Sequence, residues 1–143
     1  MELREYIRLL LTPDAQLDKS MVDDIGLLPA QAAVTGAFVA AVERRFPNDP
    51  SHADIAALVS RIRESYVEED RLPPMLGEAL VRIALGEDSL AEGMSYEEVA
   101  RGQQLMTYGM VHDLGLRGAS FEEFLTEAVQ AAEEIVANET SRS

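Results

Sequence analysis

Only two histidines, His52 and His112, and no cysteine are available for nucleophilic or metal-ligating chemistry. His52 lies near the expected start of a helix, and His112 lies near the expected end of another. Metal ligands on one helical face need spacings such as His-Glu-x-x-His or Glu-x-x-His. Neither histidine has such a partner. We therefore expect no metal site, no cofactor and no catalytic residue.

Paired carboxylates are frequent, and their abundance makes each pair uninformative about acid–base catalysis. Glu97-Glu98 and Glu122-Glu123 fall in expected first helical turns, where the helix dipole favours negative charge. The chain has no Gly-x-Gly-x-x-Gly fingerprint, no phosphate loop ending in Gly-Lys-Ser or Gly-Lys-Thr, and no Gly-x-Ser-x-Gly elbow. Nucleotide-binding and hydrolase functions therefore lack their usual signals.

One enzymatic or ligand-binding alternative remains, a pocket between two predicted helices that begin near His52 and Ser95. The residues that would line it combine guanidinium, phenol and imidazole groups, and they are Arg61, Arg63, Tyr66, Tyr108 and His112. A second arrangement would bring Arg44, Arg45, Arg61 and Arg63 together across the Pro47–Pro50 loop to bind an anion.

Helical periodicity runs through nearly the whole chain, and we find no alternating β-branched run flanked by hairpin turns. We predict an all-α fold, a compact bundle of about six or seven helices in one domain over 1–138, with a frayed tail at 139–143. The expected helices cover 2–11, with Pro13 opening the next at 13–25, and then 30–46; later helices begin near His52, after Pro73-Pro74, at Ser95 and at Ser120.

The segment 30–46 is apolar on nearly all sides, which predicts a central helix surrounded by others. Gly36 weakens this helix by roughly 1 kcal/mol relative to alanine, so we expect a close backbone crossing there. Helix-start signals also recur after 44 positions, at Leu28-Pro29 and Leu72-Pro73 and at Ser51 and Ser95. This spacing leaves open either a duplicated helical hairpin or ordinary helix punctuation.

The formal net charge of −14 disfavours binding to nucleic acid or to an anionic membrane, since both rely on basic residues. The longest apolar stretches are far shorter than the roughly 20 residues of a membrane-spanning helix. We therefore expect a cytoplasmic protein. Eleven of its 12 basic residues are arginine, and this bias is typical of a GC-rich bacterial genome.

The net negative charge is larger in the second half, because 72–143 hold 13 acidic and 4 basic residues, against 13 and 8 in 1–71. On the last predicted helix Glu123, Glu127 and Glu134 share one face, and 118–141 contain no lysine or arginine. Such a face either keeps the protein soluble or binds a basic protein.

Four methionines offer a second surface for a partner, and they are Met75, Met94, Met106 and Met110. Methionine at helical spacing also occurs in ordinary cores. Together these patterns predict a noncatalytic helical protein-interaction module, an adaptor, regulator or immunity-like inhibitor that uses an acidic or methionine-containing surface. A homodimer is a further expectation.

Overall fold

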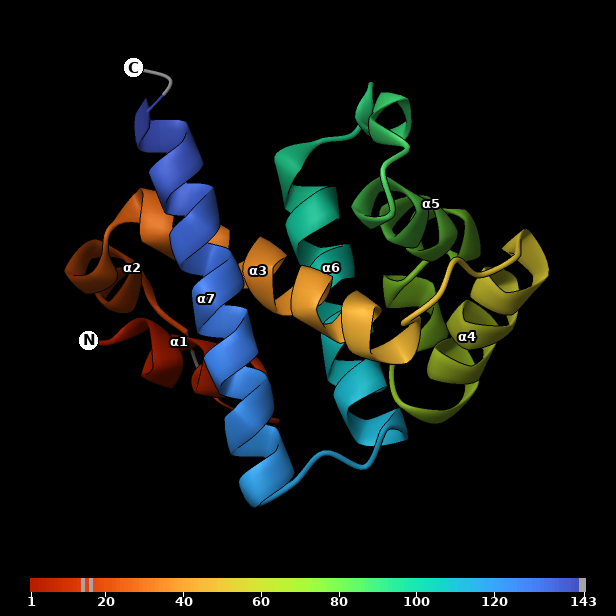
Figure 1. Cartoon of the computed structure of the whole chain (residues 1–143), viewed down its shortest axis with the longest axis horizontal. Helices are drawn as coiled ribbons and strands as arrows, with labels where there is room; N and C mark the ends of the chain where they lie inside the picture. Colours follow the sequence, from red (N-terminus) through yellow and green to blue (C-terminus); the bar gives the residue numbers. More distant parts are fainter. Residues whose placement is uncertain (14, 16, 142–143) are drawn as a thin grey trace. The chain divides into compact units, whose positions relative to one another are not determined.

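The computed structural model describes residues 1–13, 15 and 17–141, and within them it contains α-helices, two short 3-10 helices and no strand. The α-helices are α1 (Leu3–Leu10), α2 (Lys19–Ile25), α3 (Leu27–Arg45), α4 (His52–Ser65), α5 (Pro74–Ala84), α6 (Tyr96–Asp113) and α7 (Ala119–Ser141) (Figure 1). The 3-10 helices are η1 (Glu69–Arg71) and η2 (Asp88–Ala91). The predicted all-α class is confirmed.

The chain divides into two compact units. Unit 1 comprises Met1–Ala41 and Leu116–Ser143, and unit 2 comprises Val42–Gly115. The boundary falls within α3, after Ala41. The single domain over 1–138 and the central position of the 30–46 helix stay predictions.

Unit 1 is built on the packing of α1 against α7 and on a close approach between α3 and α7. Its core is dominated by small and aliphatic side chains and by two phenylalanines, including Ile7, Leu10, Ala33, Ala37, Phe38, Phe124, Leu125, Ala128 and Ala132. A Cβ added to Gly36 would stand 2.6 Å from the amide nitrogen of Ala132. The close backbone crossing predicted at Gly36 is confirmed.

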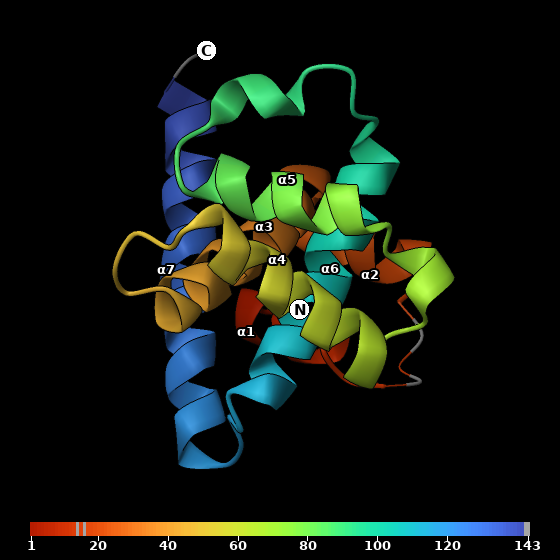
Figure 2. The same ribbon diagram turned by 90° about the vertical axis from the view of Figure 1, so that its right-hand side faces the viewer.

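Unit 2 packs α4, α5 and α6 against one another (Figure 2). The apolar stripe of α4 is buried, with Ile55, Leu58, Val59 and Ile62 each at most 2% exposed. Glycines allow close contact with these side chains. A Cβ on Gly109 of α6 would lie 2.5 Å from a methyl carbon of Ile62, and one on Gly77 of α5 would lie 2.9 Å from Val59.

Helix starts follow the predicted capping residues in α4 and α6. The Ser51 side chain accepts a hydrogen bond from the Asp54 amide, and the Asp54 side chain accepts one from the Ser51 amide, so the capping box of α4 is complete. Ser95 likewise accepts from the Glu98 amide at the start of α6.

Several boundaries differ from the sequence prediction. Helix α3 begins at Leu27, before the predicted start at 30. The second helix begins at Lys19, after the cap Asp18, and not at Pro13; residues 14 and 16 of this segment lie outside the described residues. Ser120 lies inside α7, where its hydroxyl bonds the backbone of Arg117. Residues 139–141, assigned to the tail, belong to α7, and 142–143 lie outside the described residues.

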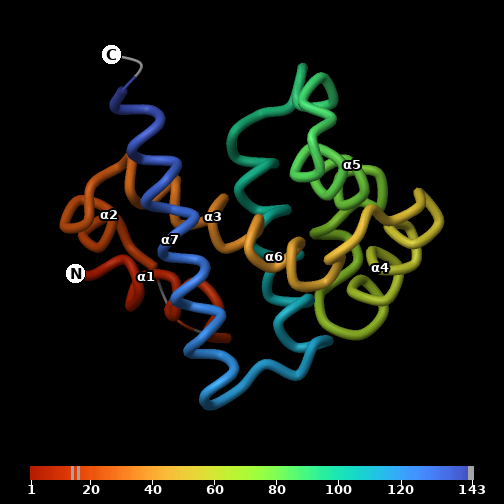
Figure 3. Tube along the Cα trace, in the orientation of Figure 1, coloured from red at the N-terminus to blue at the C-terminus, as the bar shows by residue number. Residues whose placement is uncertain are grey.

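The start of α3 also bears on the 44-residue spacing. Pro29 is the third residue of α3, whereas Pro73 is the N-cap of α5 and precedes the helix. Equivalent prolines therefore occupy different helix positions, which weakens the case for a duplicated hairpin. The chain turns by 98° between α2 and α3 at Gly26, which has a φ of 99° (Figure 3).

In the described part of the chain, no single helix is long and apolar enough to cross a membrane. Helices α2 and α3 have the length and apolar composition of a membrane-spanning segment only when they are taken together, and the chain is bent between them.

Candidate functional site

A cluster of polar and aromatic side chains connects the C-terminal turns of α4 and α6. The His112 ring lies 4.4 Å from the Tyr108 ring and 6.2 Å from the Tyr66 ring, measured between centroids. The Tyr66 hydroxyl donates to Oδ1 of Asp113 over 3.1 Å, and Arg61 donates to the same oxygen through Nε. Four of the five residues predicted for the ligand pocket are therefore brought together.

Asp113 is the residue of this cluster that the sequence analysis did not select. Its side chain is 9% exposed, whereas that of Arg61 is 62% exposed. The hydrogen bond and charge of Asp113 raise the pKa of the Arg61 guanidinium above its ordinary value. The only sequence signal was its position next to His112, because its contacts with Arg61 and Tyr66 span 52 and 47 residues.

Arg63, the fifth predicted residue, is directed elsewhere. Its Nε donates to the carbonyl of Leu72 over 2.7 Å, and Nη2 donates to the carbonyl of Glu69 over 3.2 Å. These bonds hold the segment between α4 and α5. Arg63 thus has a structural role in that connection.

The predicted convergence of arginines across the 47–50 loop does not match their contacts. The Arg45 guanidinium lies over the Phe46 ring at 5.0 Å, a cation–π contact, while Arg61 and Arg63 contact Asp113 and backbone carbonyls. An open depression of about 380 Å³ is lined by eight residues, Arg45, Phe46, Pro47, Asn48, Asp49, Pro50, Asp54 and Ala57. The carboxylates of Asp49 and Asp54 outnumber the one guanidinium in this lining, which disfavours an anion.

The second histidine lines a smaller open depression of about 250 Å³. His52 shares it with Ile55 and Leu85 and with the Arg82–Glu87 ion pair, in which Arg82 donates over 2.6 and 3.1 Å. This pair holds the pKa of Glu87 below its ordinary value. His52 and His112 therefore belong to separate surroundings within unit 2. Across the described chain, no three side chains of His, Asp or Glu are grouped to hold a metal ion.

The acidic face predicted on the last helix is exposed on α7. Glu123, Glu127 and Glu134 are all exposed, and the buried side of the same helix consists of Phe124, Leu125, Ala128 and Ala132. The two sets alternate along α7 as expected for an amphipathic helix. The three carboxylates are thus displayed on the surface of unit 1.

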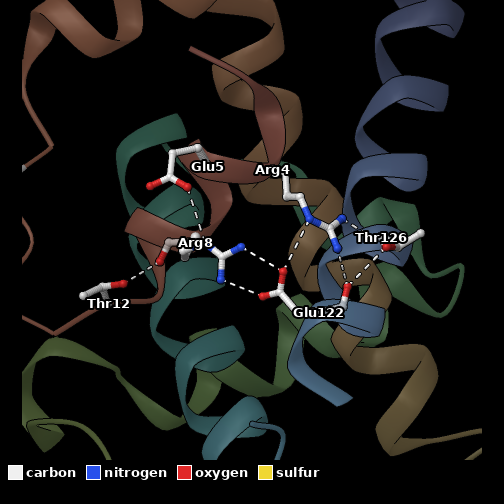
Figure 4. A network of polar contacts seen from close by, with 6 residues as sticks. All are labelled: Arg4, Glu5, Arg8, Thr12, Glu122 and Thr126. Atoms are coloured by element: carbon white, nitrogen blue, oxygen red, sulfur yellow. Dashed lines mark hydrogen bonds and ion pairs between the residues drawn. The ribbon is translucent and has the colours of Figure 1, made fainter. Parts of the chain in front are cut away.

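The arginines of α1 converge on a different carboxylate, Glu122 (Figure 4). Arg8 donates to both of its carboxylate oxygens, over 2.7 and 2.9 Å, and Arg4 donates to the Glu122 carbonyl over 2.8 Å and to Thr126 over 3.0 Å. The bonds from Arg8 hold the pKa of Glu122 below its ordinary value. The α1–α7 contact thus directs two cations to Glu122.

The methionines do not form one surface. Met106 and Met110 are fully buried in the core of unit 2, Met94 is half-buried, and Met75 is 83% exposed at the start of α5. The expectation of a partner groove that includes Met106 and Met110 is wrong. Their length and flexibility instead fill the space beside Gly77, where the Met106 sulfur would lie 3.5 Å from an added Cβ.

The described residues define an all-helical protein with two candidate surfaces, the acidic face of α7 and the cluster around Asp113. No protein family model, curated protein or solved structure matches the chain.

Proposed function

We propose that the protein is a noncatalytic helical interaction module, an adaptor, regulator or immunity-like inhibitor, that binds a basic protein partner through Glu123, Glu127 and Glu134 of α7. The observation that carries this proposal is the exposure of all three carboxylates on one helix that has no lysine or arginine of its own within 118–141. Opposite charge on a partner would speed encounter and fix orientation.

The contacts of α1 add support. Arg4 and Arg8 lie against α7, yet their hydrogen bonds go to Glu122 and Thr126 and to Glu5. Their charge is thus directed to the edge of α7 that faces α1.

The partner is a protein and not a nucleic acid or a membrane, since a chain with net charge −14 is repelled by both polyanions. The arginine-rich composition supports a bacterial origin, and we place the protein in the cytoplasm, where it acts without a cofactor. A homodimer that leaves the acidic face open is compatible with this role.

The test is a quantitative pull-down from the source organism with the wild type and with the variant Glu123→Lys, Glu127→Lys, Glu134→Lys. A stoichiometric basic partner bound by the wild type should be lost with the variant and weakened by raised salt, because screening acts on exposed charges. A second triple variant, Asp70→Lys, Glu92→Lys and Glu97→Lys, changes the net charge equally at exposed positions of unit 2 and should retain the partner. Equal binding by both triple variants would refute the acidic-face proposal.

A ligand-binding or enzymatic role for the Asp113 cluster is the second candidate. It is favoured by the meeting of Arg61, Tyr66 and His112 at one place, as the pocket hypothesis expected. Thermal stabilisation by a metabolite, together with the absence of any retained protein, would favour this candidate over the interaction module.

A further inference from the structure

The carboxylate of Asp113 is nearly buried but only partly satisfied. Its two hydrogen bonds, from Arg61 Nε and from the Tyr66 hydroxyl, both end on Oδ1. Among the described residues, no buried side-chain oxygen or nitrogen lacks a hydrogen-bond partner, so Oδ2 is the oxygen that solvent reaches. A carboxylate accepts about four hydrogen bonds, and Oδ2 therefore has unused capacity.

Two other arginine–carboxylate pairs use both carboxylate oxygens. Arg8 reaches the two oxygens of Glu122 through Nη1 and Nη2, and Arg82 reaches the two oxygens of Glu87 through Nε and Nη2. Arg61 contacts Asp113 through Nε alone. The pair at Asp113 thus lacks the two parallel bonds that make guanidinium–carboxylate contacts specific.

Arg61 can also leave at low cost. Its side chain is 62% exposed, so the Arg61 guanidinium needs little further hydration when another cation takes its place. The Asp113 carboxylate is 9% exposed, and a carboxylate so little hydrated needs a cation or a set of donors. Exchange of Arg61 for another guanidinium would satisfy both groups, since Arg61 would move into water.

Aromatic rings stand beside this carboxylate. The Tyr66 hydroxyl donates to Asp113. The ring of the exposed residue His112 lies 4.4 Å from the Tyr108 ring and 6.2 Å from the Tyr66 ring, measured between centroids. Guanidinium planes stack on aromatic faces better than a lysine ammonium does, and they are less strongly hydrated. The cluster therefore combines a carboxylate acceptor with flat apolar surfaces, the two features that arginine recognition uses.

We propose that the Asp113 carboxylate, with the Tyr66 hydroxyl and the Tyr108 and His112 rings, binds the guanidinium group of an arginine from a protein partner, and that Arg61 occupies this place until the partner's arginine displaces it. The inference rests on the proposed function in taking the arginine from a basic protein. It adds a second contact, in unit 2, of defined chemistry.

The experiment titrates N-acetylarginine amide into the wild type and into Arg61→Ala at low salt while the histidine ring resonances are followed by NMR. The chain has only two histidines, so His112 reports on the cluster and His52 serves as an internal control. Removal of the internal competitor should tighten binding to the His112 site by about fivefold, because the probe no longer has to displace Arg61 from Asp113. N-acetyllysine amide should bind more weakly to the same variant.

Three further variants make the test decisive. Asp113→Asn added to Arg61→Ala should abolish the shift of His112, and Arg101→Ala, which removes an exposed arginine of α6 away from Asp113, should behave as the wild type. Arg61→Gln is measured in parallel to guard against misfolding of the alanine variant. Equal affinity of wild type and Arg61→Ala, equal binding of the two probes, or a shift that survives Asp113→Asn would overturn the inference.

These outcomes are separate from those of the pull-down. The probe titration needs no partner protein, and the triple lysine variant of α7 should bind the probe as the wild type does. Failure of the titration with a positive pull-down would remove the arginine site alone, and the reverse result would remove the α7 face alone.

Discussion

Gly36 of α3 lies directly against the backbone of Ala132 in α7. A Cβ at position 36 would approach the Ala132 amide nitrogen to 2.6 Å, its Cα to 2.9 Å and the Ala128 carbonyl oxygen to 3.1 Å. Because these atoms belong to the backbone of a helix, no side-chain rotation can relieve the contact. Glycine at this position is therefore a requirement of the helix crossing within unit 1.

Gly36→Ala should lower the free energy of unfolding by about 1–3 kcal/mol, since overpacking against the backbone outweighs the roughly 1 kcal/mol that alanine adds to helix stability. The measurement is urea denaturation followed by circular dichroism. Glu43→Ala, at an exposed position of the same helix, should change stability little. A variant at position 36 as stable as the wild type would contradict the close crossing.

Gly109 and Ile62 should show energetic coupling, because a Cβ on Gly109 would lie 2.5 Å from an Ile62 methyl carbon. Gly109→Ala should cost about 1–3 kcal/mol alone, and less when Ile62→Ala has already cleared the space. A double-mutant cycle by chemical denaturation measures the difference. Gly102→Ala, whose added methyl would meet Leu80 and Leu76, serves as the control and should combine additively with Ile62→Ala. Additivity at Gly109 would argue against the contact.

Glu122→Gln should destabilise the protein at neutral pH, with an effect that depends on pH. Arg8 holds the folded-state pKa of Glu122 below its ordinary value of 4.5, so the carboxylate stabilises the folded state above pH 4.5, and this contribution is lost as the pH falls through the lowered pKa. The stability gap between wild type and variant should therefore close between about pH 4.5 and the lowered pKa. Thermal unfolding from pH 7 to pH 3 measures it.

Glu123→Gln provides the comparison for this pH profile. It removes the neighbouring exposed carboxylate, whereas the hydrogen bond from Arg8 goes to Glu122. The variant should therefore leave the pH profile of stability near that of the wild type. If the difference in stability between the wild type and Glu122→Gln stays constant down to pH 3, the Arg8 contact does not contribute to stability.

Arg63→Ala should lower stability by about 1–2 kcal/mol, because two backbone carbonyls lose a charged donor. Arg63→Lys should restore only part of this loss, since an ammonium on a flexible stem does not reproduce the planar fork. Denaturation curves measure both variants against Arg71→Ala, an exposed arginine of η1. If Arg63→Ala were as stable as the wild type, Arg63 would again be a candidate for ligand binding.

Ser51→Ala should cost about 1 kcal/mol, the usual effect of losing an N-cap side chain. The Ser51 hydroxyl accepts a hydrogen bond from the Asp54 amide, and this bond completes the reciprocal capping box of α4. Ser60→Ala, at an exposed position inside the same helix, should be neutral or slightly stabilising, because alanine is the better helix former. Thermal unfolding compares the two, and equal effects would argue against the cap.

The candidate site was only partly predictable. Arg61, Tyr66, Tyr108 and His112 were selected because their residue types suit binding and because two adjacent helices were expected to carry them. Arg63 was selected on the same grounds, but its side chain turns to the carbonyls of Leu72 and Glu69. Long side chains choose partners from everything within reach, and residue type alone does not indicate which partner is near.

The positions of most helices, and the faces that they bury, follow from the amino-acid sequence. The stripe of α4, the cap at Ser51 and the acidic face of α7 depend on residues a few positions apart, and the 3.6-residue period fixes their relation. The start of α2 was missed, since a proline can open a helix or simply precede one.

Contacts between residues far apart in the sequence depend on how the helices pack. Arg8 and Glu122 are 114 positions apart, and Arg61 and Asp113 are 52 apart, in a chain that offers 26 carboxylates to its arginines. The same holds for Met106 and Met110, whose spacing suits either a surface groove or a core. Helix packing settled these choices, because burial and pairing depend on how faces approach in space and not on their order along the chain.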